Sequence, residues 1–428
     1  MHMPGHKGTA LLGPEPLDLT EIEDADVLYH AEGIIRESEA NAAALFGTKK
    51  TVYSAEGSSL CIRAMLYLAL LYAKQQGKAP RIAAARNAHK TFINAAAVLD
   101  FDILWINNQQ SDSYLSCKID CGELEKELCT AKIKPIALYI TSPDYLGHIS
   151  DISGIAKICH RHGVLLIVDN AHGAYLKFLP KSQHPIDLGA DTCCDSAHKT
   201  LPVLTGGAYL HVSGHAPSLF REQAKNALAF FGSTSPSYLI LQSLDLANRY
   251  LADAYPTKLD DSIRHIGRLK EKLARLGMGL HGEEPLKITI APKAYGYTGK
   301  HLAAVLAEHS MVCEFSDPDY TVMMLTPEIE KKRLSQIGDV LEHLPPKAPI
   351  RTHPPAFTQA EFALSVRQAA FSARETLPVE ACLGRILADT SVGCPPAVPI
   401  AVCGERLSAS ALLCLQYYGI HSCSVVCE

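Results

Sequence analysis

Two short motifs place a carboxylate and a lysine where strands of a sheet would end. Val168-Asp169-Asn170-Ala171-His172-Gly173 closes the apolar run 163–169, and Asp195-Ser196-Ala197-His198-Lys199-Thr200 closes the run 191–195. The carboxyl ends of parallel strands share one edge of a sheet, so we expect the two motifs to lie close together. Taken alone, Asp169 and Lys199 are also compatible with a buried ion pair.

A pyridoxal phosphate site would use more of these residues than an ion pair does. The cofactor needs a lysine for a Schiff base and a carboxylate on its pyridine nitrogen, and Lys199 and Asp169 match these needs. Its phosphate needs N–H groups and hydroxyls at a helix N-terminus. Such groups occur at the start of the predicted helix 58–76 and beside the lysine: Gly57, Ser58, Ser59 and Ser196.

A flat side chain over the cofactor ring is the remaining requirement, and His89 is the candidate. It follows the predicted strand 81–85, in the segment Arg86-Asn87-Ala88-His89-Lys90. A lone histidine in this position is more often an ordinary loop residue held by its neighbours.

The elements around these motifs alternate between strands and helices. Near-continuous apolar runs, typical of parallel strands buried on both faces, predict strands at 81–85, 103–106, 135–141, 163–169, 191–195 and 207–212. Helices are predicted at 22–46, 58–76 and 151–162. This order predicts an α/β fold with an open, mostly parallel sheet, whose ligands bind beyond the carboxyl ends of the strands.

The last third of the chain has a different organisation. Residues 239–276 predict one or two long helices, and strands at 286–291 and 321–325 alternate with helices at 299–309 and 329–343. Five prolines within 345–355 predict a linker. We therefore expect a large cofactor-binding domain over residues 1–277, a smaller α/β domain over 278–345, and a C-terminal region over 346–428 that packs on the small domain.

Composition limits the class of protein. Hydrophobic residues make up 47 % of the 428 residues and charged residues 20 %, which is typical of globular proteins and excludes global disorder. The net charge of −5 gives no basic surplus for binding nucleic acid or an anionic membrane. The longest apolar stretch, 60–73, is shorter than the ~20 residues that span a bilayer. No signal peptide is visible, so a cytoplasmic location is expected.

The 14 cysteines do not form a recognisable framework. No Cys-x-x-Cys pair occurs, and Cys117/Cys121 and Cys423/Cys427 are four residues apart, which is poor spacing for zinc. Cys193 and Cys194 are expected to be buried strand residues. The cysteines therefore predict neither disulfides nor a metal site.

Further motifs follow one another along nearly the whole chain: Met3-Pro4-Gly5-His6-Lys7-Gly8, Asp18-Leu19-Thr20-Glu21, Arg86-Asn87-x-His89-Lys90, Asp169-x-Ala171-His172-Gly173, Ser196-x-His198-Lys199-Thr200, Thr234-Ser235-Pro236-Ser237-Tyr238, Gly296-Tyr297-x-Gly299, Glu314-x-x-Asp317 and Pro395-Pro396-x-x-Pro399-Ile400-x-x-x-Gly404-Glu405. This ordered set resembles the Orn/Lys/Arg decarboxylase family of fold type I pyridoxal-phosphate enzymes, in its short form without an N-terminal wing domain.

The resemblance implies a role for each site residue. Lys199 would form the Schiff base, Asp169 would pair with the pyridine nitrogen, and His89 and Ala171 would pack on the two ring faces. His172 would line the substrate side. The phosphate region would be held by Ser58, Ser59, Ser196 and His198, and Thr234 or Ser235 would reach the phosphate of a neighbouring subunit.

The resemblance also implies an activity and an assembly. Arginine, lysine or ornithine would lose CO₂ to give the corresponding amine, a reaction of polyamine biosynthesis, in a homodimer or higher homo-oligomer with the active site at the interface. His198, Lys199 or a nearby cysteine would protonate the substrate Cα. The carboxylates considered for the distal cation of the substrate are Asp18, Glu21, Glu314 and Asp317.

Two other functional classes remain open from the sequence. The chain could be another fold type I enzyme, such as an aminotransferase or a lyase, or a relative without catalysis. It also departs from the family pattern in two places. It begins inside the Met-Pro-Gly-His-Lys motif, where members usually have a preceding arm, and Gly206 stands where short members often have glutamine.

Overall fold

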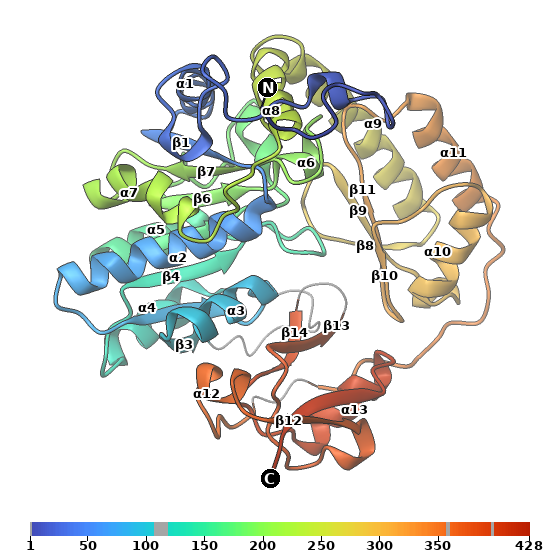
Figure 1. The fold of residues 1–428 in the computed structure, drawn as a ribbon. Helices are drawn as coiled ribbons and strands as arrows, with labels where there is room; N and C mark the ends of the chain where they lie inside the picture. The colour runs from blue at the N-terminus through green and yellow to red at the C-terminus, as the bar shows by residue number, and fades with distance from the viewer. Residues whose placement is uncertain (1, 107–118, 357–359, 395–397) are drawn as a thin grey trace. The chain divides into compact units, whose positions relative to one another are not determined.

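The computed structural model describes residues 2–106, 119–356, 360–394 and 398–428. Seven strands form one sheet in the order β1-β7-β6-β5-β4-β2-β3 (Figure 1). β4, β5 and β6 pair in parallel, whereas β7 runs antiparallel to β6 and β1 antiparallel to β7. The strands are β1 (Lys50–Ser54), β2 (Arg81–Ala85), β3 (Asp102–Ile106), β4 (Ala137–Thr141), β5 (Leu165–Asp169), β6 (Thr192–Asp195) and β7 (Ala208–Val212). The predicted α/β fold with a mostly parallel sheet is confirmed.

The chain divides into two compact units. The first comprises Met1–Ala83, Cys121–Ser142 and Asp151–Leu259, and the second Ala84–Asp120, Pro143–Ser150 and Asp260–Glu428. The domain boundaries expected at residues 277 and 345 remain a prediction.

The first unit is built around strands that are apolar along their whole length. All five residues of β5 are buried, and both Cys193 and Cys194 in β6 are fully buried, as predicted. α2 packs against β5, β6 and β7, and α5 packs against β5. The helices of this unit are α1 (Ile34–Phe46), α2 (Gly57–Gln75), α4 (Cys121–Thr130), α5 (Ile152–Arg161), α6 (Ala197–Thr200), α7 (Ser218–Ala229) and α8 (Tyr238–Ala252). Short 3₁₀ turns lie at Glu15–Leu17, Leu28–His30 and Ala174–Phe178.

The helix expected over 22–46 begins only at Ile34, and Asp26 explains the difference. Its carboxylate accepts hydrogen bonds from the backbone N–H groups of Val27, Glu32, Gly33 and Ile35. A carboxylate that binds the backbone in this way competes with helix formation before the cap and stabilises the helix after it. Residues 27–33 are therefore folded around Asp26 and not into the helix.

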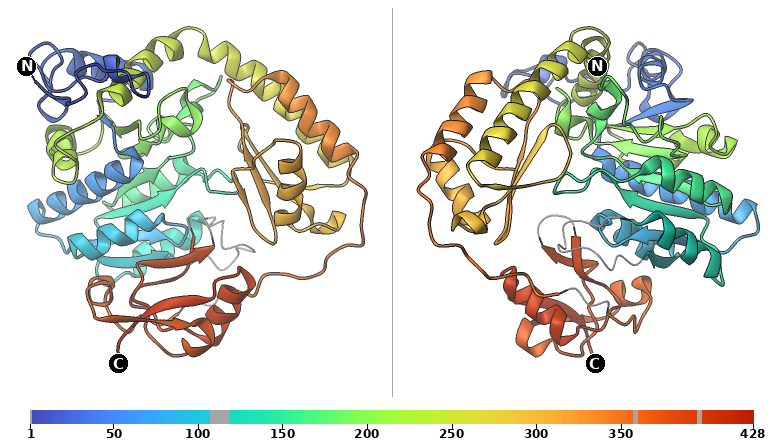
Figure 2. Two further views of the ribbon diagram at one scale, coloured as in Figure 1. Left: turned by 45° about the vertical axis from the view of Figure 1, so that its right-hand side comes forward. Right: turned by 180° about the vertical axis from the view of Figure 1, so that it is seen from behind.

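The second unit contains an antiparallel four-stranded sheet in the order β10-β11-β9-β8. α11 lies beside the later half of α9 (Figure 2), where Lys272 pairs with Glu342 at 2.7 Å. The elements are α9 (Tyr255–Arg275), which begins in the first unit, β8 (Gly279–His281), β9 (Lys287–Ala291), a 3₁₀ turn at Pro292–Tyr295, α10 (Gly299–Glu308), β10 (Phe315–Ser316), β11 (Thr321–Met324) and α11 (Lys331–Glu342). The region predicted as one or two long helices thus contains two, α8 and α9.

The C-terminal region packs within the second unit. Val379, Leu387, Ile400 and Val425 share one buried cluster with residues of the small sheet such as Val322. The elements of this region are α12 (Val366–Ala370), β12 (Arg374–Pro378), a 3₁₀ turn at Val379–Ala381, β13 (Ser391–Cys394), β14 (Val398–Val402), α13 (Ala409–Tyr417) and β15 (Ser422–Val426). α12 packs against α3 (Lys90–Leu99), which belongs to the same unit. β12 pairs with β15, and β13 with β14.

Cys117, Pro395 and Pro396 lie outside the described residues. None of the helices in the described part of the chain has the length and apolarity to cross a membrane.

Candidate active site

The carboxyl end of β5 carries a buried carboxylate with fixed donors. Asp169 is 2 % exposed. Its Oδ2 accepts a hydrogen bond from the Tyr139 hydroxyl at 2.8 Å, and its Oδ1 accepts one from the Ala171 N–H at 3.2 Å. A third partner is the neutral Cys194 thiol, 3.7 Å from Oδ1, and within the described residues no lysine, arginine or histidine pairs with this carboxylate. A buried carboxylate without a cation is costly, and a protonated pyridine nitrogen is a partner that fits it.

Lys199 lies in the short helix α6, next to the second strand end. Its Nζ is 2.9 Å from the Nε2 of His172, which is buried after β5. An imidazole at this distance can exchange a proton with the amine. The lysine and the histidine that the sequence placed in two separate motifs are therefore in direct contact.

The start of α2 forms a cup of backbone and hydroxyl groups. The Ser196 hydroxyl donates to the Ser58 hydroxyl at 2.7 Å, so hydroxyls from two separate motifs converge there. Gly57 has φ +72°, and a Cβ at this position would meet nothing within 4 Å, which shows open space above the helix start. The N–H groups and positive dipole of a 19-residue helix suit a phosphate at this place. Ser59 lies in the same turn and is half-buried.

Gly206 contacts the turn at the start of α2. Its carbonyl accepts a hydrogen bond from the Gly57 N–H at 2.7 Å. Its φ is +99°, and a Cβ would come within 2.9 Å of the Ala55 carbonyl oxygen. The residue that departs from the family pattern thus has a local reason to be glycine.

His198 is held by its backbone surroundings. Its Nδ1 donates to the Gly207 carbonyl at 3.0 Å, which leaves Nε2 as the proton-accepting atom. Burial, together with the adjacent Lys199 charge, lowers the pKa of His198 despite the bond to Gly207. The imidazole is therefore neutral near pH 7.

Thr234 and Ser235 are exposed on the segment that leads to α8. Ser235 donates its N–H to the Ser233 hydroxyl, and the Ser233 N–H donates to the Glu56 carboxylate at 2.6 Å. Because Glu56 immediately precedes Gly57, this exposed segment is tied to the start of α2. Its role toward a neighbouring subunit remains a prediction.

His89 belongs to the second unit and caps α3. Its Nδ1 accepts a hydrogen bond from the Thr91 N–H at 3.2 Å. The structure thus gives this histidine a local role as a helix cap, the alternative that the sequence left open. Its stacking on a cofactor ring remains a prediction.

A buried network behind the site joins the ends of β5 and β6. The Asp195 Oδ2 accepts from His184 at 3.1 Å and from His211 at 3.2 Å, and its Oδ1 accepts from the Asn170 amide at 2.6 Å. Although burial opposes it, attraction to the two imidazoles holds the pKa of Asp195 below its usual value. Asn170 follows Asp169 and Asp195 precedes Ser196, so the network holds the two motifs together. The sequence did not predict this network, because His184 and His211 lie outside the motifs that contain Asp195 and Asn170.

Sequence reasoning also missed an ion pair in the second unit. Arg86 binds both carboxylate oxygens of Glu405, at 2.6 and 2.7 Å, and the Glu405 side chain is fully buried. Both residues belong to motifs that carried the family resemblance, and this was the available signal. The pair fixes the turn after β2 to the C-terminal region.

The carboxylates considered for a distal cation have local partners. Asp18 contacts His6 at 3.2 Å, and Glu314 accepts from the Tyr145 hydroxyl at 2.9 Å. Asp317 accepts from the N–H groups of Asp319 and Tyr320, and burial raises its pKa to about 6. A substrate-binding role for these carboxylates, or for Glu21, remains a prediction.

Comparison with known proteins decides the family. The sequence profile described as "Orn/Lys/Arg decarboxylase, major domain" matches residues 8–291, which is more than half of the chain. The chain belongs to the Orn/Lys/Arg decarboxylase family. It is 29 % identical to an arginine decarboxylase of Halalkalibacterium halodurans, over 96 % of this chain and 88 % of that protein. It is 27 % identical to the uncharacterized protein YaaO of Bacillus subtilis, over 96 % of this chain and 89 % of that protein.

The fold of this Orn/Lys/Arg decarboxylase family member agrees with a solved relative. The crystal structure of the Francisella novicida lysine decarboxylase LdcF superposes with a TM-score of 0.81 at 16 % identity, covering 100 % of this chain and 79 % of that one. Decarboxylases of the family and other enzymes with this fold depend on pyridoxal phosphate. The predicted enzyme class, a decarboxylase, and the predicted cofactor are thereby confirmed.

Proposed function

We propose that this chain removes CO₂ from a basic amino acid, arginine, lysine or ornithine, at the carboxyl edge of the large sheet. One observation carries the proposal: a buried Asp169 without a cation, Lys199 in contact with His172, and the paired hydroxyls of Ser58 and Ser196 all lie at this edge of one unit. These groups fit the ring nitrogen, the aldehyde carbon and the phosphate of pyridoxal phosphate.

The residues around Lys199 would prepare it and hold the protons. When bound, pyridoxal phosphate supplies a protonated ring that accepts the electron pair left by departing CO₂. Asp169 would keep the ring nitrogen protonated. His172 would accept a proton from Lys199 Nζ across 2.9 Å, which leaves a neutral, nucleophilic amine. His198 would take up a proton from solvent at Nε2, because its Nδ1 is committed to Gly207, and would then pass this proton to the substrate Cα.

Arginine is the first substrate to test, because the relative from H. halodurans that spans 96 % of this chain is named an arginine decarboxylase. Agmatine would then be the product, and the reaction would belong to polyamine biosynthesis. We further propose a cytoplasmic homodimer or higher homo-oligomer in which Thr234 or Ser235 reaches the phosphate of a neighbouring subunit, and in which His89 and Ala171 pack on the cofactor ring. The domain division at residues 277 and 345 belongs to the same proposal.

A panel of carboxyl-labelled arginine, lysine and ornithine tests the reaction. We expect labelled CO₂ and the matching amine from at least one substrate. Lys199→Ala should abolish both CO₂ release and the visible absorbance of the lysine-bound cofactor, whereas Lys157→Ala, at an exposed lysine on α5, should change neither. Transfer of the amino group to a 2-oxo acid without CO₂ release would instead identify an aminotransferase. Cofactor absorbance without any turnover would identify a relative that binds but does not catalyse.

A further inference from the structure

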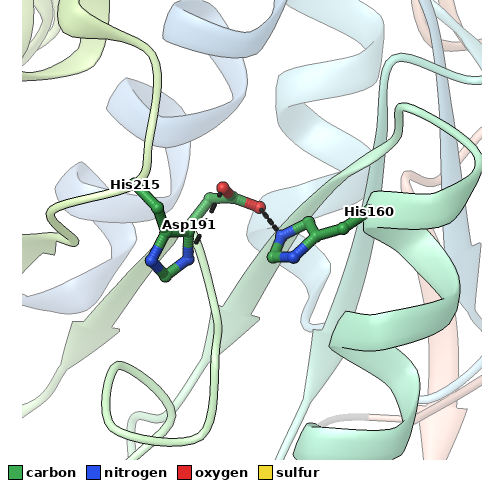
Figure 3. Close-up of side chains that lie close together, drawn as sticks. All are labelled: His160, Asp191 and His215. Carbon is green, nitrogen blue, oxygen red and sulfur yellow. Dashed lines mark hydrogen bonds and ion pairs between the residues drawn. The ribbon is translucent and has the colours of Figure 1, made fainter.

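A cluster of two histidines and one aspartate lies at the other edge of the large sheet. His160 is near the end of α5, Asp191 immediately precedes β6, and His215 follows β7. Figure 3 shows the two imidazoles on either side of the Asp191 carboxylate. The His160 Nε2 is 3.0 Å from Asp191 Oδ2, and the His215 Nε2 is 3.8 Å from Asp191 Oδ1. One ligand atom from each residue lies within 4.8 Å of the other two.

This cluster is separate from the candidate active site. Asp191 stands before the first residue of β6, whereas Ser196 and Lys199 follow its last residue. The four residues of β6 span about 13 Å at ~3.3 Å each. None of the groups assigned to the cofactor belongs to this cluster.

The carboxylate is fixed and the imidazoles are accessible. The Asp191 side chain is 3 % exposed, and its Oδ2 also accepts a hydrogen bond from the Leu166 N–H at 2.7 Å. The His160 and His215 side chains are 39 % and 46 % exposed. A buried carboxylate oriented by the backbone and flanked by solvent-exposed imidazoles gives an ion both a rigid ligand and a path of entry.

We propose that His160, Asp191 and His215 bind a divalent transition-metal ion, zinc in the first instance, through two imidazole Nε2 atoms and one carboxylate oxygen. Two histidines and a carboxylate with an open fourth position form a common zinc ligand set. Bonds of about 2.1 Å in a tetrahedron separate neighbouring ligand atoms by about 3.4 Å. The His160 Nε2 lies 3.0 Å from one Asp191 oxygen and the His215 Nε2 lies 3.8 Å from the other, so each imidazole approaches the carboxylate at close to this spacing.

Binding requires that both imidazoles lose the proton on Nε2. The His160 Nε2 donates to the Asp191 carboxylate at 3.0 Å, and the His215 Nε2 donates to the Gly189 carbonyl at 3.2 Å. On metal binding each proton moves to Nδ1 of its ring or to solvent, and the exposed His215 ring turns toward the ion. The bound ion would connect the end of α5, the start of β6 and the loop after β7.

A second cluster of the same composition shows why accessibility matters. His184, Asp195 and His211 also bring their ligand atoms within 4.8 Å, but all three side chains are fully buried. The Thr51 hydroxyl and the Asn170 amide already occupy the outer positions of this cluster. Both Asp195 oxygens and both Nε2 atoms are hydrogen-bonded, although the buried His184 Nδ1 has no hydrogen-bond partner among the described residues. Because these groups are buried and already engaged, the proposal applies to the exposed cluster alone.

Zinc titration of the chelator-treated holoenzyme against a chromophoric zinc indicator tests the site. We expect one equivalent of bound zinc per chain, with affinity lower by about tenfold or more in His160→Gln and in His215→Gln. The matched control is His265→Gln on α9. His265 lies 3.6 Å from Asp261 and is 30 % exposed, and no second imidazole joins this pair among the described residues. Zinc affinity in this control should equal that of the wild type.

Spectroscopy distinguishes zinc bound at the proposed cluster from zinc bound at a competing thiol site. The exposed Cys129 lies 3.8 Å from His162 and could bind zinc independently. Cobalt(II) in the proposed site should lack a thiolate charge-transfer band, and Cys129→Ser should keep the full affinity. Equal zinc binding in the wild type and in both histidine variants would overturn the proposal, as would loss of binding in Cys129→Ser. The test requires no decarboxylase activity, so its outcome is independent of the proposed function.

Discussion

At the scale of single residues, three buried carboxylates have partners that differ. Asp169 has neutral donors, Asp195 has two imidazoles, and Asp317 has two backbone N–H groups. The same functional group therefore has three different electrostatic settings within one chain. This difference is the basis of two predictions.

Asp169→Asn should lower kcat by about 10²–10³-fold while the cofactor still binds, because asparagine keeps the size of the side chain but cannot hold a protonated ring nitrogen. Steady-state kinetics together with cofactor absorbance measures both effects. Tyr139→Phe is the matched control, since it removes the 2.8 Å hydrogen bond to Asp169 but keeps the carboxylate, and it should lower kcat by about tenfold or less. Equal kcat in Asp169→Asn and the wild type would contradict the role of Asp169.

Asp317→Asn should change how stability depends on pH. Burial raises the folded-state pKa of Asp317 to about 6, from a usual value of 3.8, so its contribution to stability is complete below pH 3.8 and is lost as the pH rises through 6. Asparagine keeps the acceptor for Asp319 and Tyr320 and does not ionise. Between pH 4 and 6 the unfolding free energy of the wild type should therefore fall relative to that of the variant, by at most about 3 kcal/mol. A constant difference in urea titrations across this range would refute the assignment.

The sequence contained little information about the exposed histidine cluster at this scale. His160, Asp191 and His215 are separated by 31 and 24 positions and belong to no motif. They meet because β5 and β6 are parallel neighbours, which brings the end of one crossover close to the start of the next strand. Asp169 and Lys199 were predictable because each follows an apolar run, and the residue that ends such a run faces the ligand edge.

At the scale of elements, prediction succeeded where burial alone decides the structure. β5 and β6 are continuous apolar runs, and their ends were placed correctly to within two residues. β1 was not predicted because Lys50, Thr51 and Ser54 interrupt its apolar character. The start of α1 was wrong because a single side chain, Asp26, reorganises the backbone before it. Side-chain contacts of this kind depend on the folded geometry and are not visible in hydrophobic periodicity.

The turn formed by Gly57 and Gly206 gives a prediction at this scale. Gly206→Ala combines a left-handed φ with a Cβ 2.9 Å from the Ala55 carbonyl oxygen, so we expect a loss of about 2–4 kcal/mol in unfolding free energy and weaker cofactor binding. Gly77→Ala is the control, because Gly77 has φ +62° at the end of α2 but open space around it. It should cost about 1 kcal/mol and leave cofactor affinity unchanged. Equal losses in both variants would show that backbone strain, and not the contact with the α2 start, accounts for the effect.

At the scale of the whole molecule, each of the two units is assembled from separate stretches of sequence. In the second unit, the pair Arg86–Glu405 joins residues that are 319 positions apart. Composition and periodicity describe local sequence, so they predicted the smaller sheet but not this long-range pair. Both residues belong to motifs that carried the family resemblance, but the motifs did not indicate that the two side chains form a pair.

Glu405→Ala should destabilise the second unit by about 3–5 kcal/mol, because it leaves the Arg86 guanidinium without its carboxylate at a buried position. The double variant Arg86→Met/Glu405→Leu should recover part of this loss, since it removes both charges. Chemical denaturation of the wild type and the variants measures the difference. A double variant that is less stable than Glu405→Ala would contradict this account of the pair.

The discontinuity of the second unit also has a consequence for synthesis on the ribosome. The first unit is complete once residue 259 has emerged, whereas the second needs residues from 84–120, 143–150 and 260–428. At a synthesis rate of ~5–20 residues per second, about 16–64 s pass between the incorporation of Arg86 and that of Glu405. During that interval the nascent chain carries the early segments of its second unit without their C-terminal partners. This part of the protein therefore depends on post-translational completion, and chaperone binding to nascent chains should concentrate on residues 84–120.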